Sequence, residues 1–343
     1  MRMVPALAGL LAIAGAQAVA QAPAPVDAPG CWTPEQLAGT AREITPRAGV
    51  RGARVPPPKR VLTSFSPAPE PLRGSIRRVT LPEGRKLIAL TFDVGEAAYE
   101  IAGYDGRIVD YLRENNIKAT FFTGGKWLLT HRERAGQIAA DPLFEVANHG
   151  WRHANLKALS GASLAIEIEF AQAAYEEVRA GLAARACLPP GAGPPERMTL
   201  LRFPYGTCNA RALKAVAEAG LLAIQWDLAT GDPDRGRSAR AIASLVLRTV
   251  RPGSIILGHA NGRGWNAAKA LPLYVPQLIS RGYEFVTVSE LLGAGTPEIE
   301  TRCYDRRVGD TESWARGTKG RKTGQGRSRR NNGPRDGWNP FRQ

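Results

Sequence analysis

The stretch Leu87-Ile-Ala-Leu-Thr-Phe-Asp93 is a mostly apolar run that ends in a carboxylate. Six further short runs rich in apolar or β-branched residues follow it, at 118–123, 143–147, 199–203, 221–227, 254–259 and 284–288. Segments with apolar side chains three and four positions apart separate the runs, at 106–115, 162–184, 210–219, 238–250 and 267–280. This alternation predicts an α/β protein with a parallel sheet of seven strands, either an open wound sheet or a closed barrel.

Titratable side chains lie at or just beyond the carboxyl ends of five of these runs. They are Asp93, His149 and His153, Arg202, Asp227, and His259. The carboxyl ends of parallel strands form the functional face of α/β folds. A capping or surface role is the default for any one of these residues, but their shared position at five strand ends indicates one functional rim.

Two of these strand ends suggest a metal site and a general base. The histidines of Asn148-His149-Gly-Trp-Arg-His153 are four positions apart, which on a helical turn places both imidazoles on one face. That spacing suits two ligands of one metal ion, with packing or capping histidines as the alternative. Asp93 follows an apolar run, where burial raises and a nearby cation lowers the pKa of a carboxyl group. It is a candidate general base, with a helix N-cap as the alternative.

Two other strand ends carry groups suited to acyl transfer. The segment Arg202-Phe-Pro-Tyr205-Gly206 joins a cation to a turn whose backbone N–H groups could bind an oxyanion; the alternative is an ordinary turn. His259 closes an apolar run, where an imidazole is costly unless it is paired or lies at the open rim. It is a candidate general acid if Asp227 or Asp232 orients it, and otherwise a hydrogen-bonded structural histidine.

Taken in order, the motifs resemble the five motifs of the polysaccharide deacetylases, carbohydrate esterase family 4. They are Thr91-Phe92-Asp93, His149-x-x-x-His153, Arg202-x-Pro204-Tyr205, the stretch from Asp227 to Asp232, and Leu257-x-His259. The stretch Asn116-Ile-Lys-Ala-Thr-Phe-Phe122 also resembles the second strand of that family. The resemblance covers residues 87–292. It implies a distorted (β/α) barrel of about seven strands that hydrolyses an N-acetyl or O-acetyl group on a glycan with a divalent metal, usually zinc.

The resemblance also assigns a role to each matching residue. The residues carried over are Asp93 as the base, Arg202 as the residue that orients it, His149 and His153 as metal ligands, Tyr205 through its backbone N–H as an oxyanion donor, and His259 as the general acid, with Asp232 as its partner and Asp227 as the second choice. Metal and backbone donor together would stabilise the tetrahedral oxyanion, while base and acid move the protons.

The sequence departs from the family pattern at two positions. Val94 stands where the family has a second Asp that acts as the third metal ligand, and valine cannot bind a metal. Glu96 is the leading replacement because it lies close to Asp93 and offers a hard oxygen ligand; Asp93 itself or Asp105 are the alternatives. Pro233 stands where the family often has Trp, which would reshape the acetyl pocket.

The segments that flank this unit have different compositions. Residues 1–20 read as a signal peptide, with an apolar run after Arg2 and a cleavage site at Ala18-Val19-Ala20. Residues 21–81 are rich in proline and predict an extended arm, residues 82–295 the catalytic domain, and residues 296–343 a disordered tail. No later run approaches the ~18 apolar residues of a membrane span, so no span is expected after signal cleavage. We therefore expect a secreted or periplasmic protein.

The net charge of +15 is concentrated toward the carboxyl terminus. Eleven Lys and Arg against four Asp and Glu fall between residues 304 and 343. An exported protein meets anionic cell-wall polymer or lipid before nucleic acid, so we expect the tail to contact such polymers and expect no nucleic-acid partner.

Export also permits disulfides between the four cysteines. Sequence cannot select among the three possible pairings. We expect Cys31 with Cys303, because they bracket the central region, and Cys187 with Cys208. His131 is expected in a solvent-exposed first helical turn, and Trp265, in the loop after His259, is the best candidate for stacking on a sugar.

Three functions are compatible with these features. The first is a metal-dependent enzyme that removes acetyl groups from a polysaccharide, most readily the N-acetyl groups of a chitin-type or peptidoglycan-type glycan. The second is a catalytically inactive glycan-binding protein on the same barrel, which lost the metal with the second Asp. The third is a related barrel amidohydrolase that acts on a small non-sugar amide.

Overall fold

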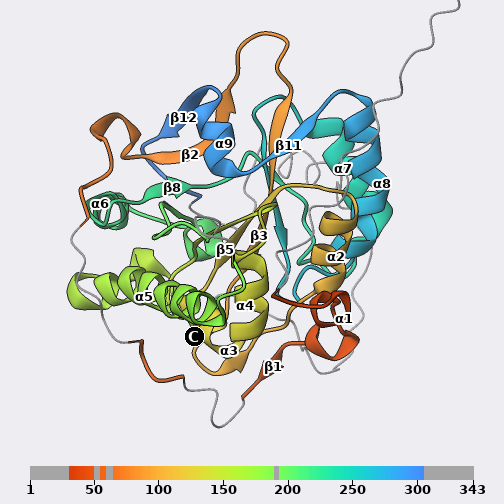
Figure 1. The fold of residues 1–343 in the computed structure, drawn as a ribbon. Coiled ribbons are helices and arrows are strands. Elements are labelled where there is room, and N and C mark those ends of the chain that lie inside the picture. Colours follow the sequence, from red (N-terminus) through yellow and green to blue (C-terminus); the bar gives the residue numbers. More distant parts are fainter. Residues whose placement is uncertain (1–30, 50–54, 59–64, 189–192, 305–343) are drawn as a thin grey trace, which may run out of the picture.

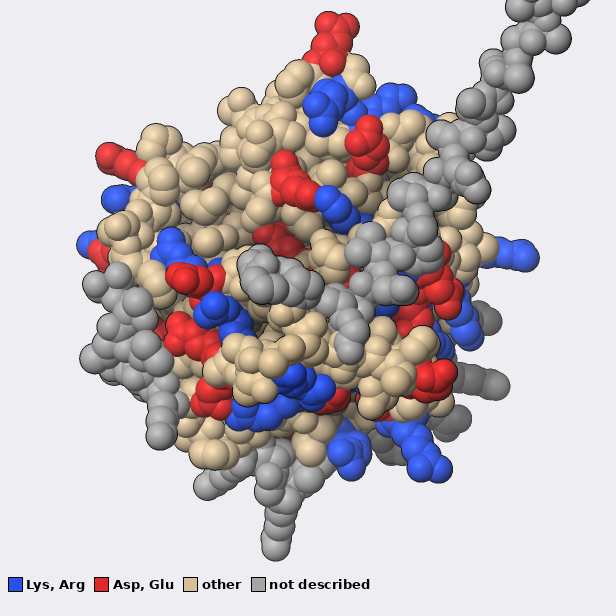
Figure 2. Space-filling model, in the orientation of Figure 1, with Lys and Arg blue, Asp and Glu red and all other residues tan. Residues whose placement is uncertain are grey.

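The computed structural model describes residues 31–49, 55–58, 65–188 and 193–304. The predicted signal peptide and the tail from residue 305 onward lie outside these residues. Within the described ranges, no helix has the length and apolar character needed to cross a membrane. On the face of the molecule seen in Figure 2, basic and acidic side chains are interspersed.

A ten-stranded sheet forms the centre of the protein, in the order β12-β2-β8-β7-β6-β5-β3-β10-β9, with β11 paired to β3. The strands are β2 Ser75–Thr80, β3 Leu87–Val94, β5 Ala119–Thr123, β6 Phe144–Asn148, β7 Leu200–Leu201, β8 Leu222–Ile224, β9 Leu228–Ala229, β10 Ile255–His259, β11 Glu284–Val286 and β12 Thr296–Glu300. Every pairing is parallel except that of β12 with β2. An antiparallel bridge from Arg78 to Ser254 joins β2 to the residue before β10, so the sheet curls into a distorted half-barrel. The predicted fold is confirmed.

Helices cover the outside of the curled sheet, with α5 on one side and α7 and α8 on the other (Figure 1). The helices are α1 Pro34–Leu37, α2 Gly106–Glu114, α3 Gly125–Thr130, α4 Arg132–Ala139, α5 Gly161–Arg185, α6 Ala210–Glu218, α7 Ala239–Thr249, α8 Ala267–Ser280 and α9 Val288–Gly293, with 3-10 turns η1 Ala41–Glu43, η2 Glu70–Leu72, η3 Leu156–Ala158 and η4 Pro204–Gly206. All seven predicted strands and five predicted helices are present. The sequence indicated a first helical turn at His131, where α4 begins, but it missed α3 and α9, because 6 residues are too few to show a clear apolar period.

Strand β3 separates two hydrophobic clusters. Its side chains alternate between the faces of the sheet, as the pleat requires. Ile88, Leu90, Phe92 and Val94 belong to the larger cluster, which also contains residues of the covering helices. Leu87 and Ala89 belong to a second cluster with side chains from β8 and β10. Asp93 is on the same side of the pleat as Leu87 and Ala89, so it faces the concave side of the sheet.

The described parts of the proline-rich segment before β3 (residues 31–49, 55–58 and 65–81) pack against the rest of the protein, unlike the extended arm predicted for residues 21–81. Strand β2 is part of the main sheet, and β1 Arg47–Ala48 pairs with β4 Glu100–Ile101. Trp32 is buried. The guanidinium of Arg134, from α4, donates to the carbonyls of Gln36, Leu37 and Ala38. The segment lacks periodicity because these long-range hydrogen bonds, rather than an amphipathic face, bind it to the protein. Strand β12 likewise belongs to the sheet although the predicted tail begins at 296.

Both disulfides differ from the expected pairing. The structure joins Cys31 to Cys187 and Cys208 to Cys303. Cys31 meets Cys187 because the amino-terminal segment packs beside the end of α5, where the Arg185 guanidinium lies 5.0 Å from the centre of the Trp32 ring. Cys303 follows β12, which brings it to the β2–β8 edge and hence to Cys208 before α6.

Candidate active site

Two candidate catalytic groups end neighbouring strands. In the parallel pairing of β3 with β10, Asp93 is the register partner of His259. Register partners on adjacent parallel strands project toward the same face of the sheet. The carboxylate and the imidazole therefore lie side by side at the carboxyl ends of the strands, on the concave face.

Arg202 holds the Asp93 carboxylate in place. The guanidinium is fully buried, and its Nη1 donates to Asp93 Oδ1 (2.9 Å) and to Thr91 Oγ1 (2.8 Å). Nη2 donates to the Gln225 carbonyl (3.1 Å), and the guanidinium carbon lies 3.9 Å from the centre of the Phe122 ring. Strand β7 ends at Leu201, so Arg202 is the first residue beyond the ladder and its side chain crosses to β3.

The charges around Asp93 keep it ionised. Burial raises the pKa of the carboxyl group, but the neighbouring His149, Arg202 and His259 together lower it below its usual value. A proton acceptor must carry a free lone pair at the working pH. The environment of Asp93 therefore favours the form that a general base requires.

His259 is oriented by Asp232. Its Nδ1 lies 3.0 Å from Asp232 Oδ1, and its backbone N–H donates to Asp232 Oδ2 (2.7 Å). The Thr230 hydroxyl also donates to Oδ1 (2.9 Å). Burial lowers the pKa of His259, but the Asp232 charge and hydrogen bond raise it above its usual value. The imidazole thus keeps its proton to a higher pH, as a general acid requires.

Asp227, the second candidate for this partner, lies at the opposite end of β10. Its carboxylate accepts hydrogen bonds from Ser254 Oγ and from the Ile255 backbone N–H, both at 2.9 Å. Arg251 also donates to it (3.3 Å). This carboxylate stabilises the start of the strand, whereas His259 ends it. Residues 227 and 232 both follow β8, but the chain between them includes β9, whose two residues pair with Ile256 and Leu257 of β10. Residue 227 therefore lies beside the start of β10 and residue 232 beside its end.

His149 presents an unpaired nitrogen to the site. Its Nδ1 lies 2.9 Å from the Arg202 carbonyl, an oxygen that can only accept, so Nδ1 carries the proton and Nε2 a lone pair. Nε2 is buried without a hydrogen-bond partner and lies 3.5 Å from Asp93 Oδ2. The His153 ring lies 5.0 Å from that of His149, between centres. Burial lowers the pKa of both imidazoles, which favours the neutral form that a metal ligand needs.

A turn, rather than the expected helical turn, brings the two histidines together. Gly150 and His153 both have left-handed backbones, with φ of 76° and 54°. The His153 ring packs directly on Gly95, where an added Cβ would lie 2.2 Å from His153 Cδ2. Asn261 Nδ2 donates to the Gly95 carbonyl (2.8 Å) and so fixes the loop after β3. The sequence analysis missed both Gly95 and Asn261; their only signal was their position within two residues of a candidate catalytic group.

Tyr205 lies beside the histidines. It occupies the middle of η4 with φ 61° and ψ 3°, and its ring centre is 4.6 Å from that of His153. The structure therefore brings together all of the residues carried over from the resemblance except Asp227.

The comparisons with known proteins agree with this arrangement. Residues 80–224 match the sequence profile of the family described as polysaccharide deacetylase. A peptidoglycan-N-acetylglucosamine deacetylase of Bacillus cereus is 30% identical over 212 residues, which cover 61% of this chain and 70% of that protein. The chain belongs to the polysaccharide deacetylase family. Members of this family typically depend on a metal.

Two further relatives define how far the likeness extends. The peptidoglycan-N-acetylglucosamine deacetylase PgdA of Listeria monocytogenes is 29% identical over 269 residues, which cover 76% of this chain and 52% of PgdA. The chain thus spans about half the length of that relative. Among solved structures, the chain is similar to a mutant of the Bacillus anthracis protein BA3943, which is described as a CE4 family pseudoenzyme with restored enzymatic activity. The alignment has a TM-score of 0.53 and 25% identity, and it covers 66% of this chain and 72% of that one.

In this member of the family, the expected third metal ligand is engaged elsewhere. The buried Glu96 carboxylate pairs with Lys126 Nζ (2.9 Å) and accepts from the Ala102 backbone N–H (2.9 Å) and the Thr130 hydroxyl (3.0 Å). These groups satisfy its oxygens, so the prediction of Glu96 as a ligand is not supported. In the part of the chain that the structure describes, no group of three or more His, Cys, Asp or Glu could hold a metal ion.

Neither of the other positions near β3 supplies a separate ligand. Val94 is buried in the larger hydrophobic cluster. The Asp105 carboxylate forms two hydrogen bonds with Arg107, each of 2.8 Å. Of the three carboxylates considered as replacements, only Asp93 lies beside the histidines. The imidazoles fit two ligand positions of a metal, and a third ligand other than the candidate base is absent from the described residues.

His131 is also not the solvent-exposed residue that the sequence predicted. Its ring stacks on that of Trp127, with centres 4.9 Å apart, and Nδ1 lies 2.8 Å from Thr130 Oγ1. Burial lowers the pKa of His131 to about 4. It therefore packs as a neutral group at the junction of α3 and α4, where its Nδ1 lies 3.7 Å from Glu96 Oε2.

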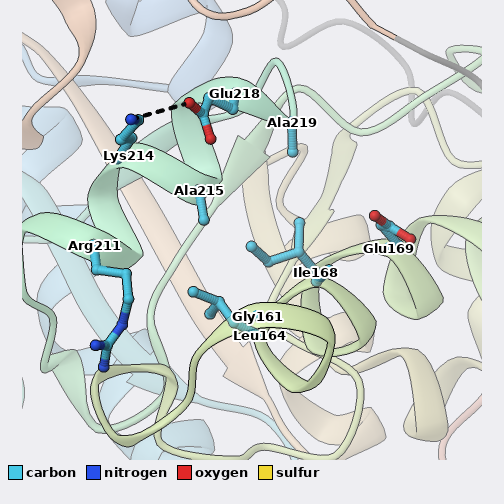
Figure 3. Close-up of a pocket in the computed structure, with 10 residues that line it drawn as sticks. Gly161, Leu164, Ile168, Glu169, Arg211, Lys214, Ala215, Glu218 and Ala219 are labelled. Atoms are coloured by element: carbon cyan, nitrogen blue, oxygen red, sulfur yellow. Dashed lines mark ion pairs between the residues drawn. The ribbon is translucent and has the colours of Figure 1, made fainter.

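A surface hollow of about 500 Å³ lies between α5 and α6, away from the site (Figure 3). Leu164 and Ile168 line it from α5, with Arg211 and Lys214 from α6. Lys214 forms an ion pair with Glu218 at its edge (3.7 Å). None of the site residues described above contributes to this lining.

Proposed function

We propose that this protein hydrolyses acetyl groups of a polysaccharide, most readily the N-acetyl groups of a chitin-type or peptidoglycan-type glycan. The observation that carries the proposal is the register pairing of Asp93 with His259, whose pKa values are shifted in opposite directions. Titratable neighbours with opposite shifts are the usual mark of a base and an acid that act on one substrate.

The reaction follows from the positions of these groups. Asp93 accepts the proton of the attacking water, while Arg202 prevents the carboxylate from rotating. His259, held by Asp232, donates its proton to the departing amine. The backbone N–H of Tyr205 donates to the oxyanion that forms on the acetyl carbonyl, a contribution that is commonly worth ~3–4 kcal/mol.

A divalent metal, of which zinc is the best match to imidazole ligands, would be held by His149 and His153. When bound it supplies a Lewis acid that polarises the acetyl carbonyl. The unpaired, buried Nε2 of His149 supports this assignment, because such an atom costs free energy unless a ligand occupies it.

The substrate and cellular location are part of the same proposal. The relatives named above support a peptidoglycan-type glycan. Two disulfides favour an oxidising compartment, so we propose secretion or a periplasmic location. Contact of the basic tail with anionic cell-wall polymer stays a prediction, because residues 305–343 lie outside the described residues.

The test is release of acetate from N-acetylated chitooligosaccharide and from peptidoglycan. Asp93→Asn should lower kcat by about 10²–10⁴-fold. Asp227→Asn is the matched control, since that buried carboxylate lies at the other end of β10 and should leave turnover unchanged. Equal turnover of Asp93→Asn and wild type would refute the mechanism.

A second candidate function is glycan binding without catalysis. Among the residues that the structure describes, the lack of a separate third carboxylate near the histidines favours it. This candidate predicts saturable binding of the same oligosaccharides with no release of acetate at any zinc concentration. Acetate release that is lost on chelation and restored by zinc would exclude it.

A further inference from the structure

We propose that the Cys208–Cys303 disulfide and Tyr304 act as a clamp that holds the Tyr205 turn in the conformation needed for its backbone N–H to serve as oxyanion donor. Cys303 and Tyr304 are therefore positioning residues, although they lie nearly a hundred positions away in the sequence. The inference deepens the proposed function and rests on it for its catalytic consequence.

The turn adopts a backbone conformation that requires support. Tyr205 has φ 61° and ψ 3°, and Gly206 follows with φ 68°. A tyrosine in the left-handed region is strained, and such residues persist only where the surrounding structure determines them. An added Cβ on Gly206 would lie 2.6 Å from the Trp226 ring, so the ring closes the space beneath the turn.

The segment after β12 supplies direct contacts to this turn. The Tyr304 backbone N–H donates to the Gly206 carbonyl (2.9 Å), and Gln225 Nε2 donates to the same oxygen (3.0 Å). The Tyr304 hydroxyl donates to the Trp226 carbonyl, and the two rings lie 4.8 Å apart between centres. Tyr304 is 4% exposed. The carbonyl that follows the strained residue is thus held from two directions.

The disulfide fastens the same two segments covalently. Cys208 comes two residues after Gly206, and its partner Cys303 directly precedes Tyr304. The hydrogen bond from Tyr304 to Gly206 therefore lies next to the cross-link, just outside the loop that it closes. Without the cross-link the segment after β12 could leave the sheet edge, and Tyr304 would leave with it.

The other disulfide provides a control for general stability. Cys31 and Cys187 are 156 positions apart, whereas Cys208 and Cys303 are 95 apart. The entropy that a cross-link removes from the unfolded chain grows with the length of the closed loop. If only stability mattered, losing Cys31–Cys187 would be at least as harmful. The clamp predicts the opposite order for kcat.

The experiment compares the double variants Cys208→Ser/Cys303→Ser and Cys31→Ser/Cys187→Ser with the wild type. Hydrogen–deuterium exchange should become faster at residues 204–207 in the first variant and stay unchanged there in the second. On N-acetylated chitooligosaccharide, kcat of the first variant should fall by about 10²-fold, as expected for a misplaced catalytic donor. KM and the pH profile should not change, because Asp93 and His259 are untouched.

Tyr304→Phe is a milder variant that keeps both disulfides and the ring. It loses the hydrogen bond to the Trp226 carbonyl and should lower kcat by roughly 3-fold to 10-fold, in line with one hydrogen bond. It tests the clamp even if the variant that lacks Cys208 and Cys303 fails to fold.

The outcomes separate the clamp from the proposed function. Absence of acetate release by the wild type would refute the proposed function and leave exchange at 204–207 to decide whether the clamp exists. Equal exchange in both cysteine variants would overturn the clamp. Faster exchange with an equal fall of kcat in both variants would overturn its positioning role.

Discussion

Replacing Arg202 by methionine tests whether the ion pair at the centre of the site is required for folding. The guanidinium is fully buried and Asp93 is 6% exposed, so neither group can exchange its partner for water. Methionine fills much of the arginine volume but leaves the carboxylate as an uncompensated buried charge. It also removes a donor from the Gln225 carbonyl.

The size of the effect follows from this burial. Removal of one partner of a buried ion pair costs about 3–5 kcal/mol. The double variant Arg202→Met/Asp93→Asn carries no charge at this position, so it should be more stable than Arg202→Met, by on the order of 2 kcal/mol. Lys214→Met removes a cation from a surface pair whose side chains are 76% and 61% exposed, and it should change stability by about 0–1 kcal/mol.

Urea denaturation of the four proteins measures these differences. At a slope of about 3 kcal/mol per molar urea, Arg202→Met should lower the midpoint by about 1–2 M. The double variant should regain part of this shift, and Lys214→Met should match the wild type. The reasoning would be refuted if the urea midpoint of Arg202→Met lay within ~0.3 M of the wild-type midpoint, because a surface ion pair has an effect of about that size. It would also be refuted if the double variant were no more stable than Arg202→Met.

Three further predictions concern the site. Asp232 raises the pKa of His259, so Asp232→Asn should lower that pKa and move the alkaline limb of the kcat/KM profile to lower pH; an unmoved limb would contradict the assignment. Because the pKa of His259 is raised on folding, its protonated form stabilises the folded state. This contribution to the free energy of unfolding is fully present below the unfolded-state pKa of His259 and is lost as the pH rises through its folded-state pKa. Gly95→Ala places a Cβ 2.2 Å from the His153 ring and should weaken zinc binding measured by calorimetry by at least about 10-fold, whereas Gly181→Ala, which meets nothing within 4 Å, should not change it. His153→Ala should abolish stoichiometric zinc in metal analysis of the purified protein, and retention of one equivalent would place the metal elsewhere.

Local patterns in the sequence were sufficient for the strands and for most of the site. Each run such as 87–93 carries its own apolar pattern, and a parallel sheet brings the residues after each run to one rim. Asp93, His149 and His259 could therefore be assigned to one site before any contact was known. The catalytic roles still depend on the resemblance and on the experiments above.

The tertiary structure decided which groups touch. Sequence order did not distinguish Asp232 from Asp227, because the choice depends on the path of β9 along β10. Nor could it show that Lys126 engages Glu96, since α3 is too short and too fully buried to display a period. The disulfide pairing depended on which segments pack beside the end of α5 and which follow the edge strand β12. In each case the deciding contact joins residues that are far apart in the sequence. Their distance in space depends on the curl of the sheet and on the lengths of its strands, which the sequence around each residue does not show.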